Sequence, residues 1–295
     1  MDEQANFSRP TTVAELLRRL ENFSTKEGWQ RGLDYKADPT DVFIVTPPKC
    51  GTTWMQQIVH GLRTRGSMDF DDIYLVVPWL HMAHDCGIDL YAPQVARPHA
   101  FKSHLVLDQN PKGGKYIVIL RNPPDALVSH YNFFEGFFFE KGSISVESFA
   151  REFYFPRRAV FNHIKSLWDR RNDADVLPLC YENMKADLPR TVERVAEFIG
   201  VRLDDELREI AIRQSDIEFM KAHQDKFEEH LIRKHRSAAM GLPSDGQLNK
   251  VRDGQVGNGK VKLSEAIRQE LDAIWKSEIE PLTGLPTYEE LRKAL

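Results

Sequence analysis

The chain has 295 residues, of which 41% are hydrophobic and 28% charged, and its net charge at pH 7 is −4. These proportions are typical of a globular protein, and the acidic balance argues against a general nucleic-acid binder. No stretch approaches the roughly 20 consecutive apolar residues of a membrane span. The three cysteines, Cys50, Cys86 and Cys180, are odd in number and widely spaced, which favours a reducing compartment. We therefore expect a cytoplasmic protein.

The first predicted element is a helix close to the N-terminus. Thr12 and Glu15 have the spacing of a capping box, in which a threonine side chain and a glutamate side chain cap the first turn. The polar residues before this helix do not resemble a signal peptide.

Four short apolar runs follow, separated by longer segments with helical periodicity. This alternation predicts a single α/β domain, residues 1–295, with a central, mostly parallel sheet flanked by helices. Ligands of such sheets bind at the carboxyl ends of the strands, so the polar residues after each run should converge. The runs are residues 42–45, 100–102, 116–120 and 176–180.

The turn after the first run, residues 46–53, has the composition of an anion-binding loop. Gly51 allows close backbone approach, Thr52 and Thr53 supply hydroxyl groups, and Lys49 supplies a positive charge at the start of a predicted helix. The turn is P-loop-like, but it is not a Walker A loop because the lysine precedes the glycine.

Two further strand ends carry candidate site residues. Lys102 and His104 lie two apart, so in an extended segment they face the same side, which suits anion stabilisation beside a general base. A histidine that is simply buried and hydrogen-bonded is the alternative. Arg121 and Ser129 could grip one phosphate, although a strand-end arginine can equally pair with a carboxylate.

Together these residues resemble the cytosolic-type sulfotransferases, whose sulfuryl donor is 3′-phosphoadenosine 5′-phosphosulfate (PAPS). The likeness runs from about residue 40 to about residue 260, and some details are more similar to the bacterial branch of that family. The motifs, in the family's order, are Lys49-Cys-Gly-Thr-Thr-Trp54, Lys102-Ser-His104, Arg121-Asn-Pro with Ser129, Tyr181-Glu-Asn-Met-Lys185 and Arg252-Asp-Gly-Gln-Val-Gly257.

The resemblance implies that a sulfuryl group passes from PAPS to a hydroxyl, or alternatively an amine, of a small and largely apolar acceptor. It implies that His104 is the general base, that Lys49 and Lys102 assist it, that 3′-phosphoadenosine 5′-phosphate (PAP) is released, and that no metal is required. The implied nucleotide-binding residues are Lys49, Cys50, Gly51, Thr52, Thr53, Trp54, Arg121, Ser129, Tyr181, Ser215, Arg252 and Gly254.

This sequence departs from the family pattern at several positions. Cys50 replaces a serine, Asp253 a basic residue, and Gly259 a tryptophan, while Ile217 occupies an aromatic position beside the adenine. The thiol of Cys50, at a helix N-terminus in a positively charged loop, could have a lowered pKa and react with oxidants. The animal dimerisation motif is not matched, so no oligomeric state is inferred.

Other readings remain open at this point. A nucleotide kinase would have a similar architecture, and a nucleotide-binding module without catalysis is a further alternative. His81, His84 and Cys86 could hold a metal, or they could form a turn near the substrate entrance. The phenylalanine-rich residues 133–139 could be core or could wall an acceptor site, and residues 221–236 predict an amphipathic helix that could belong to a lid.

Overall fold

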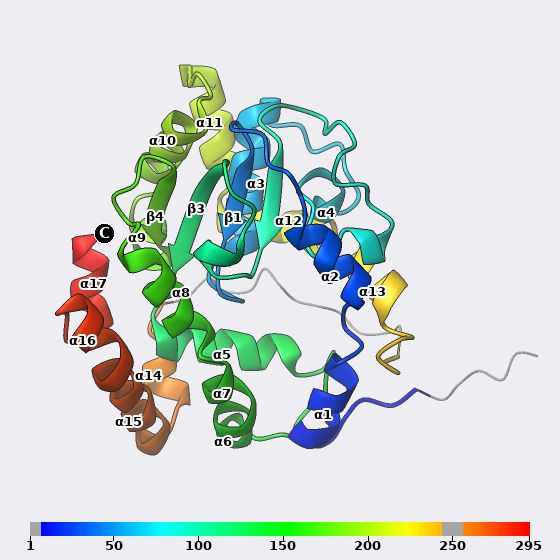
Figure 1. Ribbon diagram of the computed structural model, residues 1–295, viewed down its shortest axis with the longest axis vertical. Coiled ribbons are helices and arrows are strands. Elements are labelled where there is room, and N and C mark those ends of the chain that lie inside the picture. Colours follow the sequence, from blue (N-terminus) through cyan, green and yellow to red (C-terminus); the bar gives the residue numbers. More distant parts are fainter. Residues whose placement is uncertain (1–6, 244–255) are drawn as a thin grey trace, which may run out of the picture.

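The computed structural model describes residues 7–243 and 256–295. Two of the predicted site residues, Arg252 and Gly254, lie outside these ranges. Within them, helices surround a four-stranded sheet, and helix α5 crosses beyond one end of the strands (Figure 1).

All four strands are parallel, in the order β2-β1-β3-β4. The predicted α/β fold is therefore confirmed, and each strand lies within one residue of its predicted bounds. Because β2 lies on one side of β1 and β3 on the other, the chain changes direction at β1, where parallel sheets bind ligands. The strands are β1 (Val42–Val45), β2 (Ala100–Ser103), β3 (Lys115–Leu120) and β4 (Val176–Cys180).

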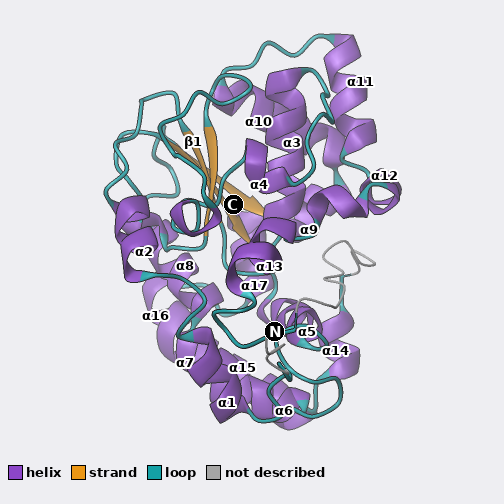
Figure 2. Ribbon diagram, turned by 90° about the vertical axis from the view of Figure 1, so that its right-hand side faces the viewer, coloured by secondary structure: helices purple, strands orange, loops and turns teal. Residues whose placement is uncertain are grey.

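Alternate residues of each strand are buried in two different hydrophobic cores. Both faces of the sheet are therefore covered, which explains why the strand sequences are continuous apolar runs. In β1, Phe43 and Val45 face one core, while Val42 and Ile44 face the other. Helices α3, α10 and α11 lie on one side of the strands and α8 on the other (Figure 2).

The helices that follow the strands position the site. The α-helices are α1 (Val13–Leu20), α2 (Lys26–Leu33), α3 (Thr52–Thr64), α4 (Ile73–Val76), α5 (Pro123–Phe134), α6 (Val146–Ser148), α7 (Phe155–Arg157), α8 (Ala159–Trp168), α9 (Tyr181–Ala186), α10 (Leu188–Ile199), α11 (Asp205–Gln214), α12 (Ile217–Ala222), α13 (His230–Arg236), α14 (Asn258–Lys262), α15 (Glu265–Ile274), α16 (Glu280–Thr283) and α17 (Tyr288–Ala294). Short 3₁₀ segments are η1 (His84–Cys86), η2 (Leu107–Gln109) and η4 (Gln224–Phe227), and π-helical segments are η3 (Phe149–Tyr154) and η5 (Trp275–Ile279).

The predicted N-terminal helix is present as α1. The Thr12 hydroxyl accepts a hydrogen bond from the Glu15 amide at 3.2 Å, as a capping box requires. The Glu15 carboxylate accepts a hydrogen bond from the amide of Thr11, whereas in a standard capping box it would accept from the amide of the N-cap residue, Thr12.

The single helix predicted over residues 221–236 is wrong. The chain there forms α12, then η4, then α13, because the buried side chain of Phe227 and the extended backbone of Glu228 interrupt the helical period. The interruption brings Glu229 to a buried position, 4% exposed.

Candidate active site

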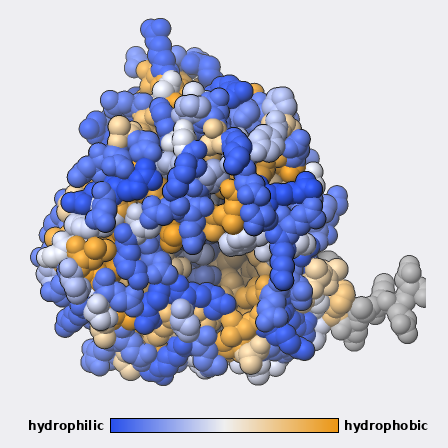
Figure 3. Space-filling model, in the orientation of Figure 1, coloured by the Kyte–Doolittle hydropathy of each residue, from blue (hydrophilic) through white to orange (hydrophobic). Residues whose placement is uncertain are grey.

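A cavity of about 740 Å³ lies where the carboxyl ends of the strands meet. Its lining includes the loop after β1, His104 after β2, Arg121 after β3 and Tyr181 after β4. The prediction that these four strand ends converge is therefore confirmed. The face of the molecule in Figure 3 is hollowed near its centre, with hydrophobic residues around the hollow.

The loop after β1 has the backbone of an anion-binding turn. Lys49 and Gly51 both have positive φ angles, 67° and 101°, which turn the chain sharply into α3. Among the described residues no side chain caps the first turn of α3, so its amides and positive dipole are available to an anion. A Cβ atom at Gly51 would lie 3.1 Å from the Tyr181 ring, so the loop and Tyr181 need a glycine there.

Arg121 ties this loop to the next strand. Its guanidinium donates a hydrogen bond to the Lys49 carbonyl at 3.0 Å and lies 4.2 Å from the centre of the Tyr181 ring. Arg121 is only 7% exposed and lines the cavity. Ser129, on α5, lines the same cavity. The two side chains therefore present a charge and a hydroxyl to the same space.

A second group of residues forms an aromatic slot beside the loop. The rings of Trp54 and Tyr181 are 5.6 Å apart, and the Trp54 indole donates to the Ser215 carbonyl at 2.7 Å. The Ser215 hydroxyl is buried and has no hydrogen-bond partner among the described residues, so it can bond to a ligand. Ile217, from the start of α12, lines the same cavity.

His104 has the hydrogen bonding of a general base. Its Nδ1 lies 2.8 Å from the Thr46 carbonyl, which can only accept, so Nδ1 carries the proton and Nε2 keeps its lone pair. Burial, and then the nearby Lys102 ammonium, hold the pKa of His104 well below its usual value. The ring is therefore neutral at pH 7.

Lys102 is buried in a box of aromatic and acidic side chains. Its ammonium lies 3.8 Å from the centre of the Trp79 ring and 3.7 Å from the Glu229 carboxylate. It donates to the Tyr74 hydroxyl, which in turn donates to Glu229 at 2.6 Å. A buried charge needs such partners, because burial without them costs several kcal/mol.

Aromatic side chains enclose the part of the cavity around Trp79, which we call the acceptor half. Trp79 contacts His104 at 5.0 Å and Phe23 at 5.6 Å between ring centres. The Lys49 ammonium of the anion-binding loop lies 4.1 Å from the centre of the Phe133 ring, so Phe133 lies where this half meets the loop. The lining residues of the acceptor half are Leu20, Phe23, Trp29, Trp79, His81, Lys102, His104, Phe133, Phe138 and Glu229.

The phenylalanine-rich segment contributes both to the core and to the cavity wall, and its contact with an acceptor stays a prediction. Phe133, Phe134 and Phe138 line the cavity, whereas Phe137 and Phe139 are buried in the core.

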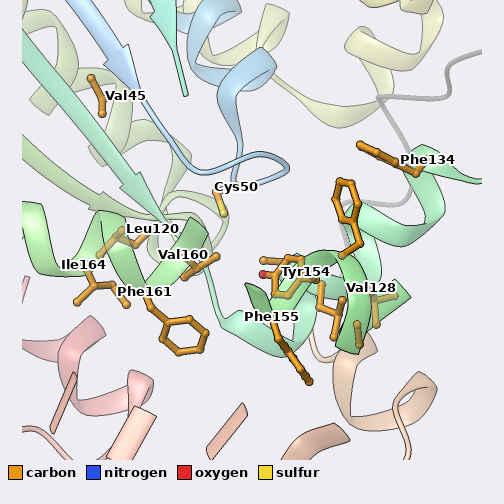
Figure 4. Close-up of a cluster of buried hydrophobic side chains, with 14 of the residues drawn as sticks. Val45, Cys50, Leu120, Val128, Phe134, Tyr154, Phe155, Val160, Phe161 and Ile164 are labelled. Atoms are coloured by element: carbon orange, nitrogen blue, oxygen red, sulfur yellow. The ribbon is translucent and has the colours of Figure 1, made fainter. Parts of the chain in front are cut away.

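The expected reactivity of Cys50 is wrong. Its side chain is fully buried and points into the core cluster that contains Tyr154 and Val160 (Figure 4). Burial raises the pKa of this thiol far above its ordinary value, and the nearby Arg121 and Lys49 do not compensate. Only the backbone of Cys50 can therefore take part in binding.

Several lining residues gave no signal in the sequence. Glu229 and Phe23 reach the cavity from segments without a motif. Asp125 accepts hydrogen bonds from the amides of Gly257 and Gly259, both at 2.7 Å, and so fixes α14 against α5. The sequence signal for Asp125 is its position after Arg121-Asn-Pro-Pro, in the first turn of a helix, where an acidic side chain is favoured.

Neither a metal cluster nor a membrane helix is found in the described part of the chain. Across residues 7–243 and 256–295, no three His, Cys, Asp or Glu side chains are grouped to hold an ion. In the same ranges, no helix has the length and hydropathy to cross a bilayer.

This chain is similar to one family of known proteins over most of its length. Residues 39–285 match the family model of the sulfotransferase domain. Sulfotransferase 1C2 of Rattus norvegicus is 26% identical, and the match covers 92% of this chain and 94% of that protein. Sulfotransferase 1B1 of Canis lupus familiaris is 28% identical, over 88% and 90% of the two chains.

Solved structures share the fold. Retinol dehydratase in complex with androsterone and PAP has a TM-score of 0.67 at 19% identity, over 93% of this chain and 96% of that one. Mouse sulfotransferase SULT7A1 complexed with PAP has a TM-score of 0.62 at 21% identity, over 87% and 90%. The greater similarity to the bacterial branch stays a prediction. The family model spans most of the chain, and the protein belongs to the sulfotransferase family.

Proposed function

We propose that this sulfotransferase moves the sulfuryl group of PAPS to a hydroxyl, or alternatively an amine, of a small and largely apolar acceptor, with His104 as the general base. The observation that carries the proposal is the neutral His104 ring, which contacts both Thr46 of the anion-binding loop and Trp79 of the acceptor half. PAP would be the second product.

The residues present fit the nucleotide. The uncapped start of α3, with Lys49, Gly51, Thr52 and Thr53, suits the 5′-phosphosulfate. Arg121 and Ser129 suit the 3′-phosphate, and the predicted contributions of Arg252 and Gly254 would add to them. The aromatic surface formed by Trp54 and Tyr181, with the Ser215 hydroxyl that lacks a partner among the described residues, suits the adenosine. Two solved structures of this fold are complexes with PAP, which supports PAP as the nucleotide.

The reaction is an in-line displacement at sulfur. The acceptor hydroxyl loses its proton to Nε2 of His104 while its oxygen forms a bond to sulfur. The bond between sulfur and the bridging phosphate oxygen breaks, and its electron pair stays on that oxygen. The Lys49 ammonium would stabilise the growing negative charge, and Lys102 would add a second positive field from the acceptor side.

The test begins with PAP binding, measured by calorimetry against ADP, which lacks the 3′-phosphate. The proposal requires a clear preference for PAP, and equal or tighter binding of ADP would overturn the nucleotide assignment.

The second step is His104→Ala, measured with PAPS and a panel of phenols and alcohols. We expect transfer to fall by about 10²- to 10⁴-fold, the usual contribution of a general base, while PAP affinity is nearly kept. His84→Ala is the matched control, because this half-exposed histidine does not line the cavity. Retention of most activity in the His104 variant would contradict its assignment as the base.

We further propose that residues 1–295 act as one domain, since Leu16 and Leu291, near its two ends, are buried in the same core. Cytoplasmic location is also a proposal, supported by the three free and buried cysteines. No nucleic-acid partner is proposed, because the net charge is −4.

A further inference from the structure

We propose that Glu229 determines which acceptors this enzyme takes, by cancelling the charge of Lys102 so that uncharged or cationic aromatic hydroxyl compounds are favoured over those that carry a carboxylate. The inference rests on the proposed function, because it assigns the acceptor to the half of the cavity around Trp79.

The two charges form a buried pair. Lys102, on β2, is 2% exposed, and Glu229, before α13, is 4% exposed. Their charged atoms are 3.7 Å apart, and the Tyr74 hydroxyl bonds to both. Both residues also line the cavity, so a bound acceptor meets the field of the pair without intervening water.

The other titratable groups of the acceptor half carry no charge at pH 7. Burial, and then Lys102, lower the pKa of His81 to about 3, and the same two causes lower the pKa of His104. The remaining walls are leucine, phenylalanine and tryptophan side chains. Among the described residues of the acceptor half, Lys102 and Glu229 are therefore the two that carry a charge.

Six other charged residues in the described part of the chain line the rest of the cavity: Lys49, Arg121, Asp125, Arg157, Lys185 and Asp216. Lys49 and Arg121 belong to the proposed phosphosulfate and 3′-phosphate sites, and Asp125 accepts hydrogen bonds from the amides of Gly257 and Gly259. An anionic acceptor would approach an anionic donor, whereas a neutral or cationic one would not be opposed.

Removal of the Glu229 charge would invert this preference. Glu229→Gln keeps the side-chain shape and the bond from Tyr74 but leaves Lys102 as a net positive charge beside the acceptor. In a medium of effective dielectric near 20, one charge about 6 Å away changes the affinity of an ionic ligand by about a hundredfold before screening. We expect at least tenfold to remain.

The experiment measures binding, so that it does not depend on transfer. 4-Ethylphenol, tyramine and 4-hydroxyphenylacetate all contain a phenol ring. Their substituents para to the hydroxyl group are neutral, positively charged and negatively charged, respectively. Each is titrated into the protein saturated with PAP, with Trp29 and Trp79 fluorescence as the signal, and the dissociation constants are confirmed by calorimetry.

For the unchanged protein, 4-hydroxyphenylacetate should bind at least tenfold more weakly than 4-ethylphenol. In Glu229→Gln that ratio should fall by at least tenfold, and tyramine should lose affinity. The double variant Lys102→Met with Glu229→Gln has no net charge and should restore the ratio to within about threefold of the unchanged protein. Glu228→Gln is the matched control, since Glu228 is adjacent, pairs with Arg233 and does not line the cavity.

PAP binding and melting temperature, measured for every variant, show which ones fold. If Glu229→Gln does not fold, the test uses the neutral double variant and Glu229→Asp, both of which leave the pair without a net charge. The ratio of the dissociation constants of 4-hydroxyphenylacetate and 4-ethylphenol should then stay as in the unchanged protein, and a changed ratio in either variant overturns the inference. A ratio that stays the same in Glu229→Gln, or a failure of all three phenols to bind the unchanged protein, also overturns it. Failure of the proposed function would instead appear as binding with the expected charge preference but no transfer from PAPS.

Discussion

The Cys50 side chain lies behind the anion-binding loop, and its sulfur faces Val160 and Tyr154 (Figure 4). The Lys49 and Gly51 conformations turn the backbone so that the residue between them points inward. Local charge would lower the pKa of such a thiol, but removal from water raises it more. The balance of these two effects, rather than the loop composition, decides the chemistry of the residue.

We therefore expect all three cysteines to react slowly with an aromatic disulfide reagent at pH 8. Burial raises the pKa of Cys86 and of Cys180 to about 12, and Cys50 shifts in the same direction, so few thiolates exist in the folded protein. Colour release from folded protein is compared with release in denaturant, where all three thiols should react at once. A single fast thiol in the folded protein, abolished by Cys50→Ser, would show that Cys50 is accessible.

At the same scale, strand ends predicted part of the cavity lining, and the family resemblance predicted Trp54, Ser129 and Ser215, which also line it. Lys49, His104, Arg121 and Tyr181 follow strands, and parallel strands end at one edge. Glu229 could not be predicted, because its partners Lys102 and Tyr74 are distant in sequence and meet it only after folding. The prediction for the Cys50 thiol failed for the same reason, since burial by η3 and α8 is not visible in the loop itself.

At the scale of elements, α14 is held against α5 by two amides and one close contact. Asp125 accepts from Gly257 and Gly259, and a Cβ atom at Gly259 would lie 2.4 Å from the Pro124 side chain. This approach gives a physical reason for glycine at a position where relatives are expected to have tryptophan. The predicted helix over 221–236 failed because the buried Phe227 and Glu229 outweigh helical propensity.

Asp125→Ala should lower the free energy of unfolding by about 2–6 kcal/mol, because two amides lose their acceptor at once and each such loss costs about 1–3 kcal/mol. Chemical denaturation followed by circular dichroism measures the change. Asp187→Ala is the control, since Asp187 caps the exposed start of α10 through a single amide and its loss should cost about 1 kcal/mol. Equal destabilisation by the two variants would contradict the role given to Asp125.

At the scale of the whole molecule, several histidines are buried in the neutral form. Burial lowers the pKa of His81 and His130 to about 3 and that of His60 and His163 to about 4. The unfolded chain takes up protons at these residues below pH 6.5, whereas the folded chain does not. Stability is therefore complete above pH 6.5 and falls as the pH decreases toward 4.

We expect the melting temperature to fall steadily between pH 7 and pH 5. Each buried histidine contributes a loss of about 1.4 kcal/mol per pH unit once the pH is below 6.5. Calorimetric scans at matched ionic strength measure the slope, and His130→Leu should make it shallower, because leucine does not titrate and can pack against the aromatic rings around residue 130. A melting temperature that does not change over this range would mean that the histidines titrate in the folded protein.

The two halves of the cavity come from different parts of the architecture. The ends of β1, β3 and β4 supply Lys49, Arg121 and Tyr181 to the nucleotide half. The acceptor half combines Lys102 and His104, from β2 and its end, with side chains from the segments between the strands, from the N-terminal part of the chain and from the chain before α13. Insertions or substitutions in those segments can therefore alter what is sulfated without moving the donor site. Such a scaffold suits directed evolution toward new acceptors, with libraries confined to Phe23, Trp29, His81, Phe138 and Glu229.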